Sequence, residues 1–68
     1  MSIKAIEAIK DRLLKSVKAG NKDAVTPYRD LMVCYNVWER DKSADNWRNL
    51  VQQAHGAIMW IPRDENSN

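Results

Sequence analysis

The sequence has little of what usually stabilises or activates a small protein. It contains one cysteine (Cys34), one histidine (His55), two glycines, two prolines and no phenylalanine. A single cysteine excludes an internal disulfide, and one cysteine with one histidine cannot supply the three or four ligands of a zinc site. We therefore expect no metal and no cofactor. A chain of 68 residues buries only about 60% of its unfolded surface, so its stability must come from helix packing or self-association.

The groups from which active sites are assembled are also scarce. Cys34 is the only thiol and His55 the only imidazole, and a nucleophile with a base still needs an oxyanion site and an orienting group. Two isolated glycines, Gly20 and Gly56, do not make a phosphate-binding loop. We expect that the chain is not an enzyme, that Cys34 is a small core residue and that His55 is an ordinary boundary residue.

Long apolar runs and a strong net charge are absent as well. No stretch approaches the roughly 18 apolar residues of a membrane span, and the first residues do not form a signal peptide. An unpaired Cys34 fits a reducing compartment, so we expect a cytoplasmic protein without membrane contact. The net charge is only +2, but residues 1–22 alone carry six basic and two acidic side chains, a net +4. The basic character therefore belongs to the first segment.

Apolar residues recur at helical spacing in three segments. The first helix is predicted over 3–19, between Ser2 as N-cap and Gly20 as C-cap. The second has two possible starts, Asp23 or Thr26, and Thr26 is preferred because it places Pro27 at the first helical position.

These start signals predict a second helix over 27–41. The third is predicted over 44–60, between Ser43 as N-cap and Pro62. Gly56 inside the third helix costs about 1 kcal/mol relative to alanine, so it is expected to mark a close helix crossing or a weak point.

The fold class predicted from these segments is all-α. No segment alternates with the period of a strand, and short turns make successive helices antiparallel. We expect a single domain over 1–62, either a three-helix bundle or a dimerising helical hairpin with a third helix. Residues 63–68 contain no apolar residue and are expected to be disordered.

Surplus apolar side chains are the most informative functional signal. Met59 and Trp60 fall on the otherwise polar side of the third helix, and Val33 and Val37 fall on the polar side of the second. Trp60 has two interpretations: it folds back over the end of the bundle, covering Gly20 or the turn near Pro27, or it belongs to an interface.

The first functional hypothesis is a protein-binding or regulatory module. Its contact residues are Val33, Val37, Met59 and Trp60, and Lys15 and Lys18 steer an acidic partner. The expected assembly is a homodimer. Small accessory proteins of phages and mobile elements, which bind and alter a host protein, are a possible origin for such a chain.

The alternative hypothesis is a helix-turn-helix-like DNA-binding regulator. The outer face of the third helix offers side chains of the kinds that read base edges, namely Arg48, Asn49, Gln52 and Gln53. However, residues 43–68 are net −1 and the lysines lie on the first helix, whereas phosphate contacts dominate DNA affinity. A third alternative is a structural subunit of a larger helical assembly.

Overall fold

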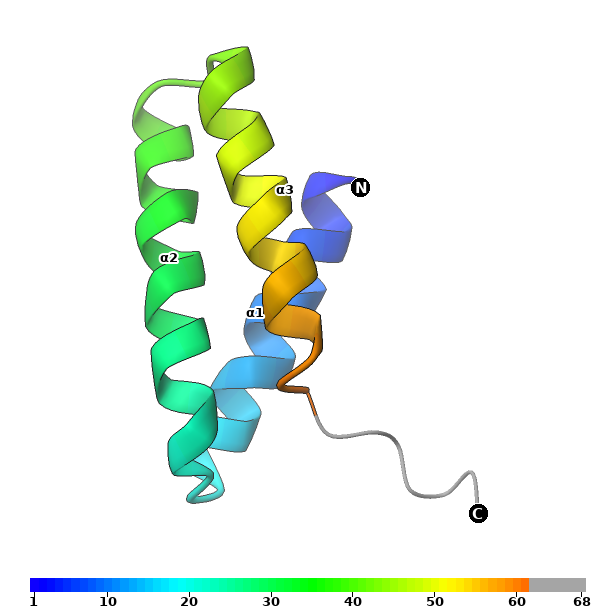
Figure 1. The fold of residues 1–68 in the computed structure, drawn as a ribbon, viewed down its shortest axis with the longest axis vertical. Helices are drawn as coiled ribbons and strands as arrows, with labels where there is room; N and C mark the ends of the chain where they lie inside the picture. The colour runs from blue at the N-terminus through cyan, green and yellow to red at the C-terminus, as the bar shows by residue number, and fades with distance from the viewer. Residues whose placement is uncertain (62–68) are drawn as a thin grey trace.

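The computed structural model describes residues 1–61, so the predicted disordered tail at 63–68 lies outside the described residues. Three α-helices and one 3-10 helix follow in the order α1 (Ile3–Lys18), η1 (Lys22–Ala24), α2 (Val25–Arg40) and α3 (Ala44–Ile58). No strand occurs within residues 1–61, and the all-α prediction is confirmed. Helices α2 and α3 form an antiparallel hairpin, which α1 crosses obliquely (Figure 1). The described chain is a small three-helix bundle.

The end of α1 is fixed by a hydrogen-bonded glycine turn. The N–H of Gly20 donates to the carbonyl of Val17 at 3.0 Å, and the N–H of Asn21 donates to the carbonyl of Ser16 at 3.1 Å. These two bonds define a Schellman motif, which needs a residue with a left-handed backbone after the last helical turn. Gly20 supplies it with φ +101°. The predicted C-cap signal of the first helix therefore has the expected role.

Helix α2 begins at Val25, two residues before the predicted start. The side chain of Asn21 accepts the N–H of Asp23 at 3.0 Å, and the 3-10 turn that starts there runs directly into α2. Thr26 is therefore inside the helix and does not cap it. Pro27 is tolerated in the first turn because N–H groups there have no carbonyl partner within the helix.

Helix α3 has the predicted cap and a slightly earlier end. Ser43 Oγ accepts the N–H of Asn46 at 3.2 Å, as expected for an N-cap serine. The helix ends at Ile58, and Met59 is its C-cap, whereas the prediction extended to residue 60. Met59 and Trp60 therefore lie at and just beyond the helix end.

The core is small and wholly apolar. Its fully buried large side chains are Ile6, Leu13, Leu31 and Leu50, at least one from each α-helix, and smaller residues complete it (Ile9, Ala24, Ala54, Ala57). No polar or charged side chain is buried within residues 1–61. Since apolar burial is the main favourable term in folding, this cluster holds the three helices together.

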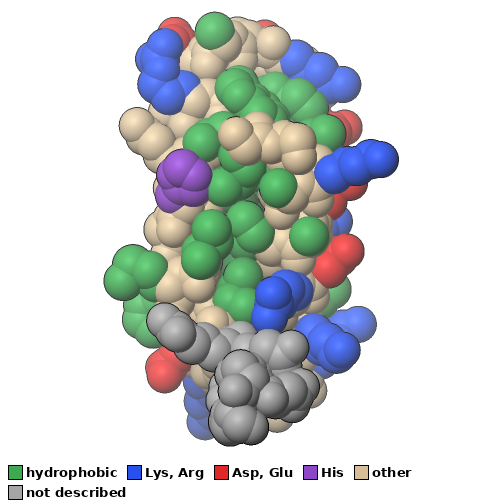
Figure 2. All heavy atoms as spheres, turned by 90° about the vertical axis from the view of Figure 1, so that its right-hand side faces the viewer, with side chains coloured by type: hydrophobic (Ala, Val, Ile, Leu, Met, Phe, Trp, Pro, Cys, Tyr) green, Lys and Arg blue, Asp and Glu red, His purple; other side chains and the backbone are tan. Residues whose placement is uncertain are grey.

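The oblique path of α1 leaves the two sides of the hairpin unequally covered. Helix α2 packs extensively on α3, whereas α1 makes fewer contacts with α3 than with α2. Apolar residues at helical spacing in the third helix predict a core stripe of Trp47, Leu50, Val51, Ala54, Ala57, Ile58 and Ile61. The side chain of Ile58 is nevertheless 45% exposed. Figure 2 views the molecule from the right of Figure 1, and hydrophobic side chains run down the middle of this face, with most of the charged side chains along its right-hand edge. Helix periodicity predicts the apolar side of α3 but not how far α1 covers it.

Gly56 does not mark a close helix crossing. A Cβ placed on Gly56 would have no atom of another element within 4 Å. Of the two interpretations of Gly56, the close helix crossing is wrong, and the weak point within the helix remains. The cost of glycine in α3 is therefore not offset by closer packing.

Candidate functional site

The structure exposes all four apolar residues that the sequence pattern assigns to partner binding. The exposed fraction is 56% for Val33, 45% for Val37, 82% for Met59 and 49% for Trp60. Ile58 and Met1 are also exposed. The sequence pattern does not predict their exposure at a binding surface, because Ile58 fits the core stripe and Met1 precedes the first helix. Exposed large apolar side chains mark a binding surface where they form one contiguous patch.

Val33 and Val37 lie on one side of α2 with two polar residues nearer its start. Thr26, Asp30, Val33 and Val37 follow one another at intervals of four, three and four residues, which places them along one side of an α-helix. All four are exposed. This side of α2 begins beside α3, because Thr26 and Asp30 line a groove between the two helices.

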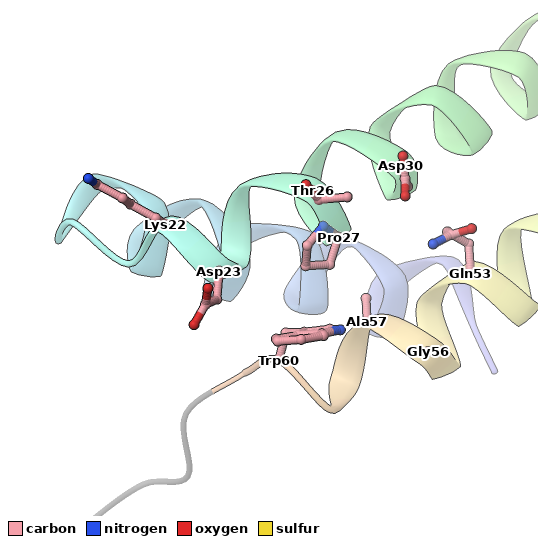
Figure 3. Close-up of a pocket in the computed structure, with 9 residues that line it drawn as sticks. All are labelled: Lys22, Asp23, Thr26, Pro27, Asp30, Gln53, Gly56, Ala57 and Trp60. Atoms are coloured by element: carbon pink, nitrogen blue, oxygen red, sulfur yellow. The ribbon is translucent and has the colours of Figure 1, made fainter.

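The groove has a volume of about 360 Å³ and lies between the first turns of α2 and the last turns of α3. Thr26, Pro27 and Asp30 line it from α2, and Gln53, Gly56 and Ala57 line it from α3. Figure 3 shows Trp60 at one end of the groove, with its ring beneath Pro27, and shows Asp30 and Gln53 facing each other farther along.

The floor and the ends of the groove differ in polarity. Pro27 and Ala57 are buried and supply apolar surface, and the hydrogen of Gly56 leaves open space where a side chain would begin. Asp23, next to Trp60, and Asp30 at the far end are both exposed. The groove therefore combines a hydrophobic floor with carboxylates at its margins.

Trp60 partly satisfies both interpretations of its position. It folds back over the end of the bundle near Pro27, since both residues line the groove, and yet 49% of its side chain stays exposed. Gly20 does not line the groove. Trp60 thus lines the groove with Thr26 and Asp30, the first residues of the exposed side of α2, whereas Val33 and Val37 do not line it. Met59 is among neither the groove residues nor the core.

The basic residues assigned to steering occupy the last turn of α1. Lys15 and Lys18 are exposed there, where the helix dipole favours positive charge. Neither lines the groove. Any attraction that they exert on a partner therefore acts over the surface and not inside the groove.

Three residues of the DNA-binding alternative are exposed on α3, Arg48, Asn49 and Gln52, whereas the fourth, Gln53, lines the groove. Asn49 and Gln52 are exposed, and Arg48 Nη1 is 3.2 Å from Asp45 Oδ1, a pair on the surface of α3. Gln53, in contrast, is partly buried and lines the groove beside α2. A carboxylate beside Arg48 and the turn of Gln53 towards α2 reduce the set of side chains available to a DNA duplex.

The remaining reactive side chains have structural surroundings. Cys34 is half-buried against the core, and burial together with the nearby charge of Asp30 raises the pKa of its thiol, which disfavours the reactive thiolate. His55 is exposed on α3. Within residues 1–61, no three histidine, cysteine, aspartate or glutamate side chains gather as potential metal ligands.

One polar contact ties α1 to α2. The hydroxyl of Tyr35 donates a hydrogen bond to Glu7 Oε2 at 3.0 Å. The ammonium of Lys10 lies 5.5 Å from the centroid of the Tyr35 ring, within the range of a cation–π contact. The bond to Glu7, desolvation and the carboxylate charges of Glu7 and Glu39 raise the pKa of Tyr35. Sequence periodicity gave no signal for this pair, because the two residues lie on different helices.

Comparison with known proteins finds no matching family model, no significantly similar curated protein and no solved structure that matches the fold. Among the described helices, none has both the length and the apolar character needed to cross a bilayer. The chemistry of the groove and of the exposed apolar residues is therefore the basis for a functional assignment.

Proposed function

We propose that this chain is a non-catalytic protein-binding module. Its contact residues are Val33, Val37, Met59 and Trp60, and we refer to these four exposed residues as the apolar surface. The observation that supports the proposal is the 45–82% exposure of all four in a chain with so small a core. Tryptophan in particular is enriched among the residues that dominate binding energy at interfaces.

The proposed partner is a second copy of the chain, or another protein with an acidic surface. A domain of this size gains stability from oligomerisation, and a two-fold interface would place the same apolar surface on both copies. Lys15 and Lys18 are exposed and would speed association with an acidic protein by long-range attraction. A regulatory role through such a partner is part of the proposal.

The proposal is tested by light scattering over a range of protein concentrations. We expect the mass to rise with concentration towards a dimer, and the double variant Trp60→Ser with Met59→Ser to weaken association at least about tenfold, as expected for the loss of an interface tryptophan. The circular dichroism of the helices should change little, since both residues lie outside the buried core.

Ile58→Ser is the matched control. Ile58 is 45% exposed and neighbours Met59, but it does not line the groove that Trp60 lines. Association should survive this change. A double variant that loses its fixed tertiary structure would show that Trp60 and Met59 belong to the core, and a wild type that stays monomeric would remove the homodimer.

DNA binding through α3 is the competing function. Light scattering with and without a mixed-sequence DNA duplex, in low and moderate salt, distinguishes it from protein binding. Exposed Arg48, Asn49 and Gln52 on one helix are the observation in its favour. It predicts binding that weakens steeply with salt and that is lost when Arg48 and Gln52 are replaced by alanine. A dimer that ignores the duplex contradicts it.

A further inference from the structure

The groove beside Trp60 contains an unexplained glycine. A glycine inside a helix is unfavourable relative to alanine, and no neighbouring element approaches Gly56 closely enough to require one. Gly56 nevertheless lines the groove between α2 and α3. A Cβ at this position would have open space around it, so helix packing does not require the glycine, and a methyl group there would add bulk to the wall of the groove.

The charge of the groove is opposite to that of the whole chain. Two of its residues, Asp23 and Asp30, are acidic and one, Lys22, is basic, whereas the chain carries +2. Figure 3 shows the side chain of Lys22 extending away from Trp60 and the groove floor. Within residues 1–61 the two ion pairs are Lys10–Asp11 and Arg48–Asp45. No basic group of this range therefore neutralises the two groove carboxylates by direct contact.

The arrangement of these groups matches a long cationic side chain. Trp60 offers a half-exposed indole ring at one end, a flat apolar surface against which an aliphatic stem can pack. Pro27 and Ala57 supply an apolar floor for an aliphatic stem. At the other end, the carboxylate of Asp30 faces the amide of Gln53, and both have oxygens that accept hydrogen bonds.

We infer that this groove is a subsite for an arginine side chain presented by the protein partner. Arginine fits better than lysine because its guanidinium has five N–H donors for two or more acceptors. The stem lies along the Trp60 ring and over Pro27 and Ala57, next to the space left by Gly56, and the guanidinium at the far end is held by Asp30 and Gln53. The inference rests on the proposed function, since it specifies the chemistry of the partner at one point of the apolar surface.

The test uses the full chain, labelled with ¹⁵N, and the probe N-acetyl-arginine N-methylamide. The indole N–H signal of Trp60 is identified by its absence in Trp60→Phe. We expect this signal and the backbone signals of Gly56 and Gln53 to shift saturably, with a Kd on the order of 1 mM, as for a single anchoring side chain. The matching citrulline derivative, which has the same shape without the charge, should bind at least about threefold more weakly, and added salt should weaken the arginine probe.

Three variants locate the site. Asp30→Asn should lower the affinity for the arginine probe about threefold or more. Asp45→Asn, which removes an exposed carboxylate outside the groove, should leave that affinity unchanged. Gly56→Ala should weaken binding because its methyl group narrows the groove. Arg63→Ala should leave the Trp60 signal in place; a shift as large as that produced by the probe would show that the chain's own Arg63 is the occupant and would overturn the inference.

The other outcomes are equally decisive. Equal affinity for the arginine and citrulline probes, or shifts spread over acidic residues far from Trp60, would overturn the subsite. Because the titration needs no partner protein, it can fail while the mass still rises with concentration, and in that case the protein-binding proposal stands without this subsite. If the probe binds but the chain associates with nothing, the protein-binding proposal fails by itself.

Discussion

Gly56→Ala should make the isolated protein more stable. Gly56 is exposed, lies within the last turn of α3 and has open space where a Cβ would stand, with no atom of another element within 4 Å of that position. Replacing a helical glycine by alanine lowers the entropy of the unfolded chain and stabilises by about 0.5–1 kcal/mol. For a domain of this size, that corresponds to a rise of about 2–8 °C in Tm.

Gly20→Ala is the matched control with the opposite expected sign. Gly20 adopts φ +101° at the end of α1, a conformation that costs an alanine roughly 1–2 kcal/mol. Alanine at Gly20 meets no neighbouring atom within 4 Å, so its effect isolates backbone strain from crowding. Thermal and urea unfolding followed by circular dichroism at 222 nm measure both variants.

The two glycine variants should therefore change the stability of the protein in opposite directions. A Gly56→Ala protein that unfolds at a lower temperature than wild type would refute the claim that α3 has open space at this position. A functional reason for Gly56 would then lose its support as well. A Gly20→Ala protein at least as stable as wild type would refute the left-handed backbone conformation of Gly20 at the end of α1.

Two further predictions concern the core and the contact between α1 and α2. Leu50→Ala removes a fully buried side chain and should lower the free energy of unfolding by about 2–5 kcal/mol, most of the stability of a small domain. Val33→Ala, at a 56% exposed position, should lower it by less than about 0.5 kcal/mol. Equal losses in urea unfolding would contradict the assigned core. Tyr35→Phe should cost about 0.5–1.5 kcal/mol by removing the hydrogen bond to Glu7. Folding raises the pKa of Tyr35 above its ordinary 10.0, so the phenol loses its proton at lower pH in the unfolded chain than in the folded one. The contribution of Tyr35 to stability is therefore complete below pH 10 and is lost as pH rises through the folded-state pKa. Urea unfolding between about pH 8 and 11 should show this fall in wild type and a smaller one in Tyr35→Phe, and equal falls would contradict the assignment.

The sequence by itself determined the number and type of the elements. Apolar residues at intervals of three and four, the caps Ser2 and Ser43, and the C-terminal Gly20 act within one or two helical turns, so local rules are sufficient for them. The same periodicity predicted that Val33 and Val37 lie outside the core. The start of α2 was misplaced because two local signals competed there: Asn21 begins a 3-10 turn, and the Thr26–Pro27 pair resembles a helix start.

The tertiary structure decided which apolar and polar side chains share a surface. The tilt of α1 leaves Ile58 exposed, although the sequence pattern places Ile58 among core residues, because a helix pattern describes one element and not its neighbour. The groove brings Trp60 and Gly56 to Asp23 and Asp30, which are separated from them by more than twenty residues. Such a combination depends on how α2 and α3 pack at their ends, and packing between helices is set by long-range contacts that no local pattern contains.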